Sequence, residues 1–366
     1  MANIKSLIER LGKRIQSEER GTVFVGVDVH KKSYHIAVWS SVTDGLVFDS
    51  VAPASPEALA SLLEPFAKAI RRVTYEAGPT GYGLARYLIG KGFAVEVIAP
   101  SETPQKPGDS EKSDRLDAIE LARLSSKNNL QPVYIPTPEE EADRQVTRWR
   151  ETRRKEVSRT KVRIKMFLLE YGVAAPQGLK NWGKAAIQAL WKISLPLPGI
   201  SEAFTGLLRD LDYHLDQLKA AEAAVHKLSR EKRHKERSDL LQKVGGVGEI
   251  TAMTLLTELP RIEQRFTSKR SLGKMLGLAP KIRGTGQKIK QMGRIRCGNS
   301  HLRGILIEAA WAWVRRDDQA KNLYRRMLAN TGNKKKAIVA VARKLGIILW
   351  RMLVTNEPYN PKLVTA

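Results

Sequence analysis

The segment Val23–Trp39 constrains the fold more than any other part of this sequence. Two runs rich in apolar and β-branched residues, Val23–Val29 and Tyr34–Trp39, flank a short polar turn. Such runs predict adjacent strands of a β-hairpin, and the nearly continuous first run predicts a central strand buried on both faces. One carboxylate, Asp28, interrupts that first run. Because an unpaired ionised carboxylate is costly in a protein core, Asp28 requires a charged partner or a metal ion.

The sequence leaves both interpretations of Asp28 open. In the first, Asp28 ends its strand and forms a salt bridge with a cation of the turn, His30, Lys31 or Lys32. In the second, it is a metal ligand together with other carboxylates. The deciding observation is whether other acids converge on it.

The region after the hairpin predicts an α/β domain. A third strand, followed by alternating strands and helices up to about residue 138, indicates a mixed sheet covered by helices. Ser55 as N-cap and Pro56 at the first helical position predict a helix that continues to Ile70. Pro132 begins a last predicted short strand.

The remaining chain is predicted to be helical. Residues 139–171 contain no helix breaker, which predicts one long helix, with a partner over Phe204–Leu228 in a coiled coil or helical hairpin. From Ser238 the helical pattern continues, interrupted by many glycines. The expected organisation is an N-terminal helix (1–20), an α/β catalytic domain (21–138), a helical linker (139–237), an all-α C-terminal domain with a helix-hairpin-helix-like segment (238–356) and a tail (357–366).

The charge of the chain indicates a polyanionic partner. The 63 Lys and Arg residues against 38 Asp and Glu give a net charge of +25, which favours nucleic acid. No apolar run is long enough to cross a bilayer, and residues 1–20 are charged rather than signal-like, so we expect no membrane partner. The single cysteine, Cys297, excludes an internal disulfide framework and a cysteine-rich zinc site, and it fits a reducing cytoplasm.

Four acids of the first domain form the main chemical hypothesis. Asp28 lies within a strand, Glu76 ends another, and Asp114 and Asp117 share one face of a helix. Clustered carboxylates repel unless a cation lies among them, and oxygen ligands on a phosphate-seeking protein favour Mg²⁺, as a pair of ions about 3.5–4 Å apart. In the alternative interpretation, Ser113 or Asp114 caps the helix and Asp117 interacts with its dipole. Acids in this order are typical of a ribonuclease-H-like nuclease domain.

Two segments of the glycine-rich C-terminal third favour DNA contacts. Gly246 and Gly248 lie in a predicted helix–turn–helix whose backbone N–H groups suit a phosphate, although a tight turn without a ligand is the alternative. Thr285 lies between two glycines on a predicted basic loop, where spacing alone does not distinguish a reactive hydroxyl from a turn residue. Further residues with cationic side chains for phosphate contacts are Lys288, Arg294, Arg296 and Arg303.

Several sequence blocks occur together in a specific order. In the first domain they are Val27–Lys31, Glu76 with Gly78, and Lys112–Ala118. In the C-terminal domain they are Val247–Ala252, Leu276–Pro280, Gly298–Arg303 and Glu308–Trp311. Together these blocks resemble the DEDD insertion-sequence transposases, which are bridge-RNA-guided, serine-dependent recombinases related to the pilin-gene invertases. The resemblance covers most of residues 21–356.

This resemblance implies a Holliday-resolvase-like domain, a helical linker and a smaller helical transposase domain. It implies Mg²⁺ at Asp28, Glu76, Asp114 and Asp117, homo-oligomers (dimer or tetramer), and a noncoding guide RNA that selects donor and target DNA in the bacterial nucleoid. It also implies a nucleophilic serine, whose place is taken here by Thr285. The Gly-x-Ile-Thr-Lys block that usually follows is altered as well, to Gly-Arg-Ile-Arg-Cys over residues 293–297.

We therefore expect a Mg²⁺-dependent, RNA-guided DNA transposase that cuts and rejoins strands by phosphoryl transfer with a hydroxyl nucleophile. Two other functions fit parts of the sequence. A ribonuclease-H-like Holliday-junction resolvase or nuclease would use only the four acids and water. A non-enzymatic nucleic-acid-binding protein would use the acids as caps and ion pairs. A covalent protein–DNA adduct separates the first function from the second, and divalent-dependent cleavage excludes the third.

Overall fold

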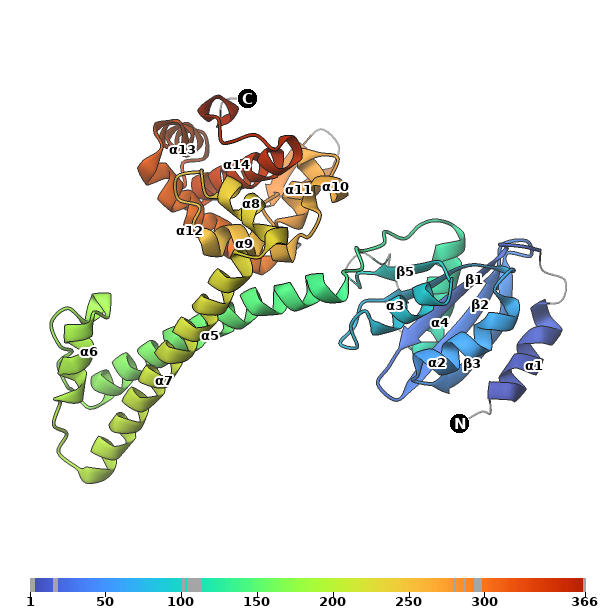
Figure 1. Cartoon of the computed structure of the whole chain (residues 1–366), viewed down its shortest axis with the longest axis horizontal. Coiled ribbons are helices and arrows are strands. Elements are labelled where there is room, and N and C mark those ends of the chain that lie inside the picture. Colours follow the sequence, from blue (N-terminus) through green and yellow to red (C-terminus); the bar gives the residue numbers. More distant parts are fainter. Residues whose placement is uncertain are drawn as a thin grey trace. The chain divides into compact units, whose positions relative to one another are not determined.

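The structure is a computed structural model that describes residues 4–15, 19–100, 103, 113–279, 281–285, 288–292 and 298–364. It divides the chain into two compact units, Met1–Thr137 and Pro138–Ala366 (Figure 1). Each unit has its own hydrophobic core. The finer division of the second unit into a linker and a C-terminal domain stays a prediction.

The first unit is built on a mixed sheet of five strands in the order β3-β2-β1-β4-β5. These strands are β1 (Val23–Val29), β2 (Ser33–Ser40), β3 (Gly45–Pro53), β4 (Ile70–Glu76) and β5 (Val95–Ile98). Strands β1, β2 and β3 are antiparallel neighbours, whereas β4 pairs in parallel with β1 and β5 in parallel with β4. The predicted hairpin and the central position of β1 are therefore confirmed.

Helices cover both faces of this sheet. They are α1 (Ile4–Ile15), α2 (Pro56–Leu63), α3 (Gly83–Gly90) and α4 (Asp114–Ser126). The predicted N-cap of α2 is confirmed, because the Ser55 hydroxyl accepts a hydrogen bond from the Ala58 N–H. The predicted extension of α2 to Ile70 is wrong. A 3₁₀ turn, η1 (Glu64–Phe66), follows Leu63 instead, because Pro65 lacks the N–H that a continued α-helix needs.

The predicted strand at Pro132 is also wrong. In the structure Pro132 forms only an isolated bridge with Ile98 of β5. A proline cannot donate to a ladder of hydrogen bonds, so the segment does not extend the sheet.

The two faces of β1 differ in what they pack against. Val23, Val25 and Val27 point into the core that the sheet shares with α1, α2 and α3. Gly26 points the other way, toward α4, where an added Cβ would lie 2.1 Å from the carbonyl oxygen of Ala118 and 2.5 Å from the nitrogen of Ala122. Real Cβ atoms do not approach backbone atoms so closely, so glycine at this position is what lets α4 rest on β1.

The second unit begins with two long helices that pack along each other, α5 (Pro138–Glu170) and α7 (Pro198–Ser229), as the sequence predicts. Between them the chain forms a 3₁₀ turn, η2 (Leu179–Asn181), and a short helix, α6 (Lys184–Trp191). Apolar side chains of all four elements form one buried cluster. Its members on α5 and α7 are Val157, Ile164, Leu168, Phe204, Leu208 and Leu211.

The C-terminal part of the second unit is mainly helical. Its helices are α8 (Lys232–Leu241), α9 (Glu249–Glu258), α10 (Ile262–Arg265), α11 (Lys269–Met275), α12 (Ser300–Arg316), α13 (Asp318–Thr331), α14 (Lys334–Thr355) and the 3₁₀ turn η3 (Pro361–Val364). The expectation of an all-α domain is wrong in one segment. Strands β6 (Lys281–Thr285) and β7 (Lys288–Met292) form a two-stranded antiparallel sheet. Their Lys-Ile-Arg and Lys-Ile-Lys sequences alternate with the strand period of two.

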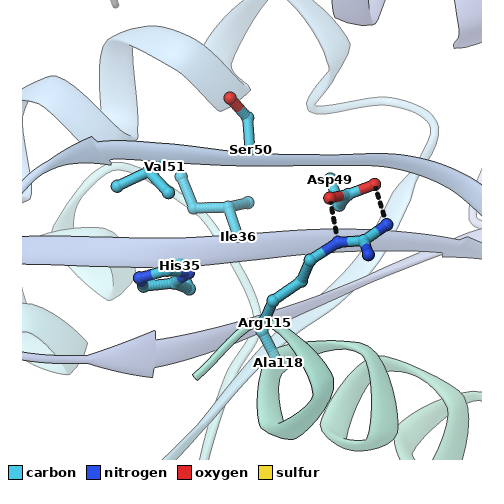
Figure 2. Close-up of a pocket in the computed structure, with 7 residues that line it drawn as sticks. All are labelled: His35, Ile36, Asp49, Ser50, Val51, Arg115 and Ala118. Atoms are coloured by element: carbon cyan, nitrogen blue, oxygen red, sulfur yellow. Dashed lines mark hydrogen bonds and ion pairs between the residues drawn. The ribbon is translucent and has the colours of Figure 1, made fainter. Parts of the chain in front are cut away.

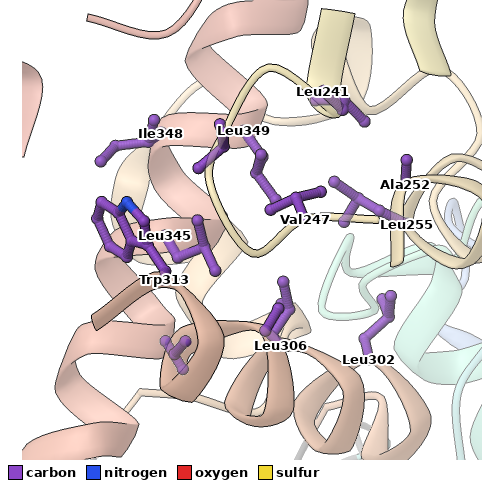
Figure 3. Packing of buried hydrophobic residues seen from close by; sticks show 14 of the residues in the cluster. Leu241, Val247, Ala252, Leu255, Leu302, Leu306, Trp313, Leu345, Ile348 and Leu349 are labelled. Carbon is purple, nitrogen blue, oxygen red and sulfur yellow. The ribbon is translucent and has the colours of Figure 1, made fainter. Parts of the chain in front are cut away.

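The core of these helices includes Trp313, which is fully buried (Figure 3). The connection between α8 and α9 packs against this region through Gly246, whose φ is +98°. A Cβ on Gly246 would lie 2.5 Å from the backbone nitrogen of Trp313. Both the backbone conformation and the lack of space therefore require glycine at this position. Within the described part of the chain, no helix has the length and apolar character needed to span a bilayer.

Replacing Gly26 with alanine should destabilise the first unit. The new methyl group would meet backbone atoms of α4, which move only if the whole helix shifts, so we expect Gly26→Ala to lower the free energy of unfolding by about 2–3 kcal/mol. Gly90→Ala is the matched control, because a Cβ at this end of α3 meets nothing within 4 Å. Urea denaturation of the two variants tests this, and equal stabilities would contradict the assigned role of Gly26.

Candidate active site

The register of the sheet brings Asp28, His35 and Glu76 to the face covered by α4. Asp28 pairs directly with His35 of β2, and paired residues of neighbouring strands share a face. On the other side, the pairing of β1 with β4 ends at Val27 and Tyr75. Asp28 and Glu76 are the next residues of these two parallel strands, so they lie at neighbouring positions near the strand ends.

Helix α4 supplies the second pair of acids, Asp114 and Asp117, in its first turn. The Ser113 hydroxyl caps the helix by accepting a hydrogen bond from the Leu116 N–H. The capping interpretation is thus confirmed for Ser113. It leaves both aspartates available for other contacts, and the packing of α4 on Gly26 directs its first turn to the end of β1.

Asp28, His30 and Asp114 form a compact set of potential metal ligands. The Nε2 atom of His30 lies 2.9 Å from Oδ2 of Asp28 and 3.4 Å from Oδ1 of Asp114. One ligand atom of each residue lies within 4.8 Å of the other two, and among the described residues no other such set of three occurs. The structure therefore brings two of the four predicted acids together, with a histidine between them.

This set has the electrostatics of a cation site. The hydrogen bond to Asp28 and the charge of that carboxylate, with a smaller contribution from Asp114, raise the pKa of His30 above its usual value. A protonated His30 would form ion pairs with both Asp28 and Asp114. The ion pair with Asp28 is the one expected in the first interpretation of the sequence, in which Asp28 forms a salt bridge with a cation of the turn. Carboxylate oxygens and an imidazole nitrogen are also donors for a divalent ion, so the residues fit a metal as well.

Glu76 and Asp117 do not belong to this set. The Oε1 atom of Glu76 accepts a hydrogen bond of 2.6 Å from the Thr103 hydroxyl. Asp117 is exposed and follows Asp114 by three residues on the same helix. Their roles as metal ligands stay a prediction.

A cavity of about 110 Å³ lies between β2, β3 and the start of α4 (Figure 2). Its lining residues are His35, Ile36, Asp49, Ser50, Val51, Arg115 and Ala118. Arg115 of α4 donates to Asp49 of β3 through Nε at 2.6 Å and through Nη2 at 3.2 Å. This hydrogen-bonded pair lowers the pKa of Asp49. It also ties the first turn of α4 to the edge strand.

Sequence reasoning treated His30 only as an ion-pair partner and did not identify His35. The Nε2 atom of His35 lies 3.7 Å from Oδ2 of Asp114. Its signal in the sequence is the hairpin itself, because a turn over residues 30–33 places position 35 opposite position 28.

The predicted C-terminal site residues are only partly described. Thr285 is the last residue of β6 and pairs with Lys288, the first residue of β7, so it lies beside the hairpin turn rather than on a long loop. Arg294 and Arg296 fall outside the described residues. Arg303 directs Nη1 toward the carbonyl oxygen of Gly277, at 3.5 Å.

Of the two glycines before α9 that were predicted to bind phosphate, only Gly246 is required by the packing of the protein. Gly246 packs against α12, whereas a Cβ on Gly248, the N-cap of α9, would meet nothing within 4 Å. In the first turn of α9, the Glu249 carboxylate accepts a hydrogen bond from the Ser229 hydroxyl and lies 3.1 Å from Nδ1 of His226. An anionic side chain in this turn favours the tight-turn interpretation. Phosphate binding by Gly246 and Gly248 stays a prediction.

A buried carboxylate, Glu258, joins three helices of the second unit. Its oxygens accept hydrogen bonds from Arg148 of α5 at 2.7 and 2.9 Å and from Asn299 at 2.7 Å, and His301 lies 3.6 Å away. Burial alone would raise the pKa of Glu258, but His301, Arg148 and Asn299 outweigh it and hold the pKa at about 2. Asn299 also caps α12 by accepting from two backbone N–H groups, so Glu258 fixes the start of that helix.

The fold and these residues define an enzyme class. An α/β unit with paired acids where its sheet ends, joined to a helical unit in a strongly basic chain, is typical of enzymes that process nucleic acid. Two family models match the chain, a DEDD model described as a transposase over residues 25–173 and the model of the transposase IS116/IS110/IS902 family over residues 238–325. The chain belongs to the IS110 family of transposases, enzymes that cleave DNA and transfer its strands.

Individual relatives agree with this family. The chain is 31% identical to the putative transposase y4qE of Sinorhizobium fredii, over 89% of this chain and 87% of the relative. It is 26% identical to the transposase for insertion sequence element IS1533 of Leptospira borgpetersenii, over 93% and 99% of the two chains. It is 23% identical to the pilin gene-inverting protein of Moraxella bovis, over 76% and 79%. The family predicted from the sequence blocks is confirmed.

Replacing Glu258 with glutamine should destabilise the protein in a pH-dependent manner. Because the folded-state pKa of about 2 lies below the ordinary value of 4.5, the carboxylate contributes stability that is complete above about pH 5 and is lost as the pH falls from there toward 2. We expect Glu258→Gln to lower the free energy of unfolding by about 2–3 kcal/mol at pH 7 and by less at pH 3.

Urea denaturation at both pH values measures this difference. Glu263→Gln is the control, since Glu263 forms a more exposed ion pair with Arg237 and should change stability by less than about 1 kcal/mol. An equal loss for Glu258→Gln at pH 3 and pH 7 would contradict the role of its charge.

Proposed function

We propose that this chain catalyses DNA transposition by divalent-metal-dependent phosphoryl transfer in a ribonuclease-H-like, Holliday-resolvase-like domain. The observation that carries the proposal is the approach of Asp28 and Asp114, with His30, at the strand ends where Glu76 also lies. The sheet order β3-β2-β1-β4-β5, with three antiparallel strands followed by two parallel ones, supports the proposed fold.

Mg²⁺ is the proposed ion, with Asp28, Glu76, Asp114 and Asp117 as its ligands. Carboxylate oxygens are the ligands that Mg²⁺ prefers, and a bound ion would supply positive charge to the reacting phosphate. The protein's own contribution is orientation. The Ser113 cap and the Arg115–Asp49 pair hold the first turn of α4. The Thr103 hydroxyl holds the carboxylate of Glu76.

Thr285 is the proposed nucleophile. Its hydroxyl would attack the phosphorus of a DNA strand, lose its proton and form a phosphothreonine ester, while the displaced strand oxygen leaves and gains a proton. A hydroxyl of the receiving strand would then attack the ester, which rejoins DNA and restores the threonine. The neighbouring glycines, Gly284 and Gly286, permit close approach of the backbone to a phosphate, and the paired residue is a lysine, Lys288.

The proposed partners are donor DNA, target DNA and a noncoding guide RNA in the bacterial nucleoid, bound by a homo-oligomer. The net charge of +25 supports polyanionic partners. The proposed phosphate contacts are Gly246, Gly248, Lys288, Arg294, Arg296 and Arg303.

Trapping of a covalent adduct tests this function. With a nicked suicide DNA substrate and Mg²⁺, the wild type should form a protein–DNA adduct that maps to Thr285, and chelation of the metal should abolish it. Thr285→Val keeps the shape without the hydroxyl, so it should lose adduct and recombination together. Thr285→Ser is the matched control and should retain both, because the hydroxyl remains and the methyl no longer crowds the attack.

Three results would contradict parts of the proposal. Full recombination by Thr285→Val, or an adduct at another hydroxyl, would show that Thr285 is not the nucleophile. Metal-dependent cleavage by the wild type without any adduct would favour a nuclease that uses water. Cleavage that persists after chelation would show that the reaction does not require a metal ion.

A further inference from the structure

We propose that His30 is a direct ligand of the catalytic divalent ion, through Nε2, and that this ligand strengthens the binding of first-row transition ions such as Mn²⁺ more than it strengthens the binding of Mg²⁺. This inference rests on the metal centre of the proposed function and extends it, because it adds a nitrogen ligand to a site otherwise built from carboxylates.

The distances fit three ligands of one ion. Neighbouring ligands of an octahedral ion, each about 2.1 Å from the metal, are about 3.0 Å apart, and opposite ligands are about 4.2 Å apart. His30 Nε2 lies 2.9 Å from Asp28 Oδ2 and 3.4 Å from Asp114 Oδ1. All three residues offer ligand atoms within 4.8 Å of one another. These spacings require little movement to close around an ion.

The backbone places His30 for this role. The His30 N–H donates to the Ser33 carbonyl oxygen at 3.1 Å, which closes the β1–β2 hairpin turn. The side chain of His30 is 48% exposed and that of Asp114 is 53% exposed, so an ion has access from solvent. Asp28 is more buried, at 22%, and forms the inner side of the set.

His35 provides a matched comparison within the same site. It contacts the other oxygen of Asp114, with Nε2 3.7 Å from Oδ2. It does not belong to the three-residue set. The ring centroids of His30 and His35 are 6.5 Å apart, and the two ring planes are nearly perpendicular. We therefore assign His35 to orienting Asp114 and His30 to the ion itself.

The chemical consequence is a change in metal preference. Mg²⁺ takes oxygen ligands and keeps much of its water, whereas imidazole is a good ligand for first-row transition ions. A site that adds one imidazole to its carboxylates therefore binds Mn²⁺ more tightly than an all-oxygen site does, with a smaller gain for Mg²⁺.

Pulsed electron paramagnetic resonance of Mn²⁺ bound to the full-length protein tests the ligand directly. The wild type should show the nitrogen coupling of one directly bound imidazole. His30→Ala should lose this coupling, and its Mn²⁺ affinity, measured by calorimetric titration, should fall by at least about tenfold. Mg²⁺ affinity should fall by less. His35→Ala should keep the nitrogen coupling.

Further variants separate the possible failures. His30→Gln keeps a polar side chain with an amide oxygen, so it should remain folded, bind Mn²⁺ and lack the imidazole coupling. Mn²⁺ bound to the wild type without nitrogen coupling, or coupling that survives in His30→Ala, would overturn this inference alone. Mn²⁺ binding that is unchanged when Asp28→Asn and Asp114→Asn are combined would overturn the proposed metal centre itself.

Discussion

The close contact between α4 and β1 is the interaction on which the arrangement of the acidic residues depends. Gly26 has no side chain, so the backbone of α4 at Ala118 and Ala122 rests directly on the strand. Asp114 lies one helical turn before Ala118, which means that the helix position determines the carboxylate position. A buried hydrogen bond of 2.8 Å between Thr74 and Ser125 fixes the other end of the helix to β4. The first-turn acids are therefore oriented by packing before any ion binds.

Strand register has the same effect on the other acids. Val23, Val25 and Val27 belong to the core on one face of the sheet, so Asp28 must point to the opposite face, where α4 lies. A slip of one residue would turn Asp28 into the apolar core and turn the valines toward α4. The hydrophobic burial of three side chains thus makes the position of one carboxylate nearly unavoidable, and the parallel pairing with β4 brings Glu76 to the same end of the sheet.

Much of this could be predicted from the sequence, because the decisive signals are local. The apolar runs of β1 and β2, the Ser113 cap of α4 and the uninterrupted α5 were all predictable. The contact of His35 with Asp114 was not, since it needs both the hairpin register and the long-range packing of α4. The β6–β7 hairpin was missed because its strands are short and basic and lack a continuous apolar face. Thr285 could be placed by resemblance alone, and its role stays a prediction.

Anomalous scattering from crystals of the wild-type protein soaked in Mn²⁺ tests the central claim most directly, namely that the packing of α4 on β1 builds a metal site. The account predicts an anomalous peak for an ion bound to carboxylate oxygens of both Asp28 and Asp114. In the present structure these oxygens lie 2.9 and 3.4 Å from Nε2 of His30. A peak only elsewhere in the molecule, or crystals with no ion between Asp28 and Asp114 at saturating Mn²⁺, would contradict it.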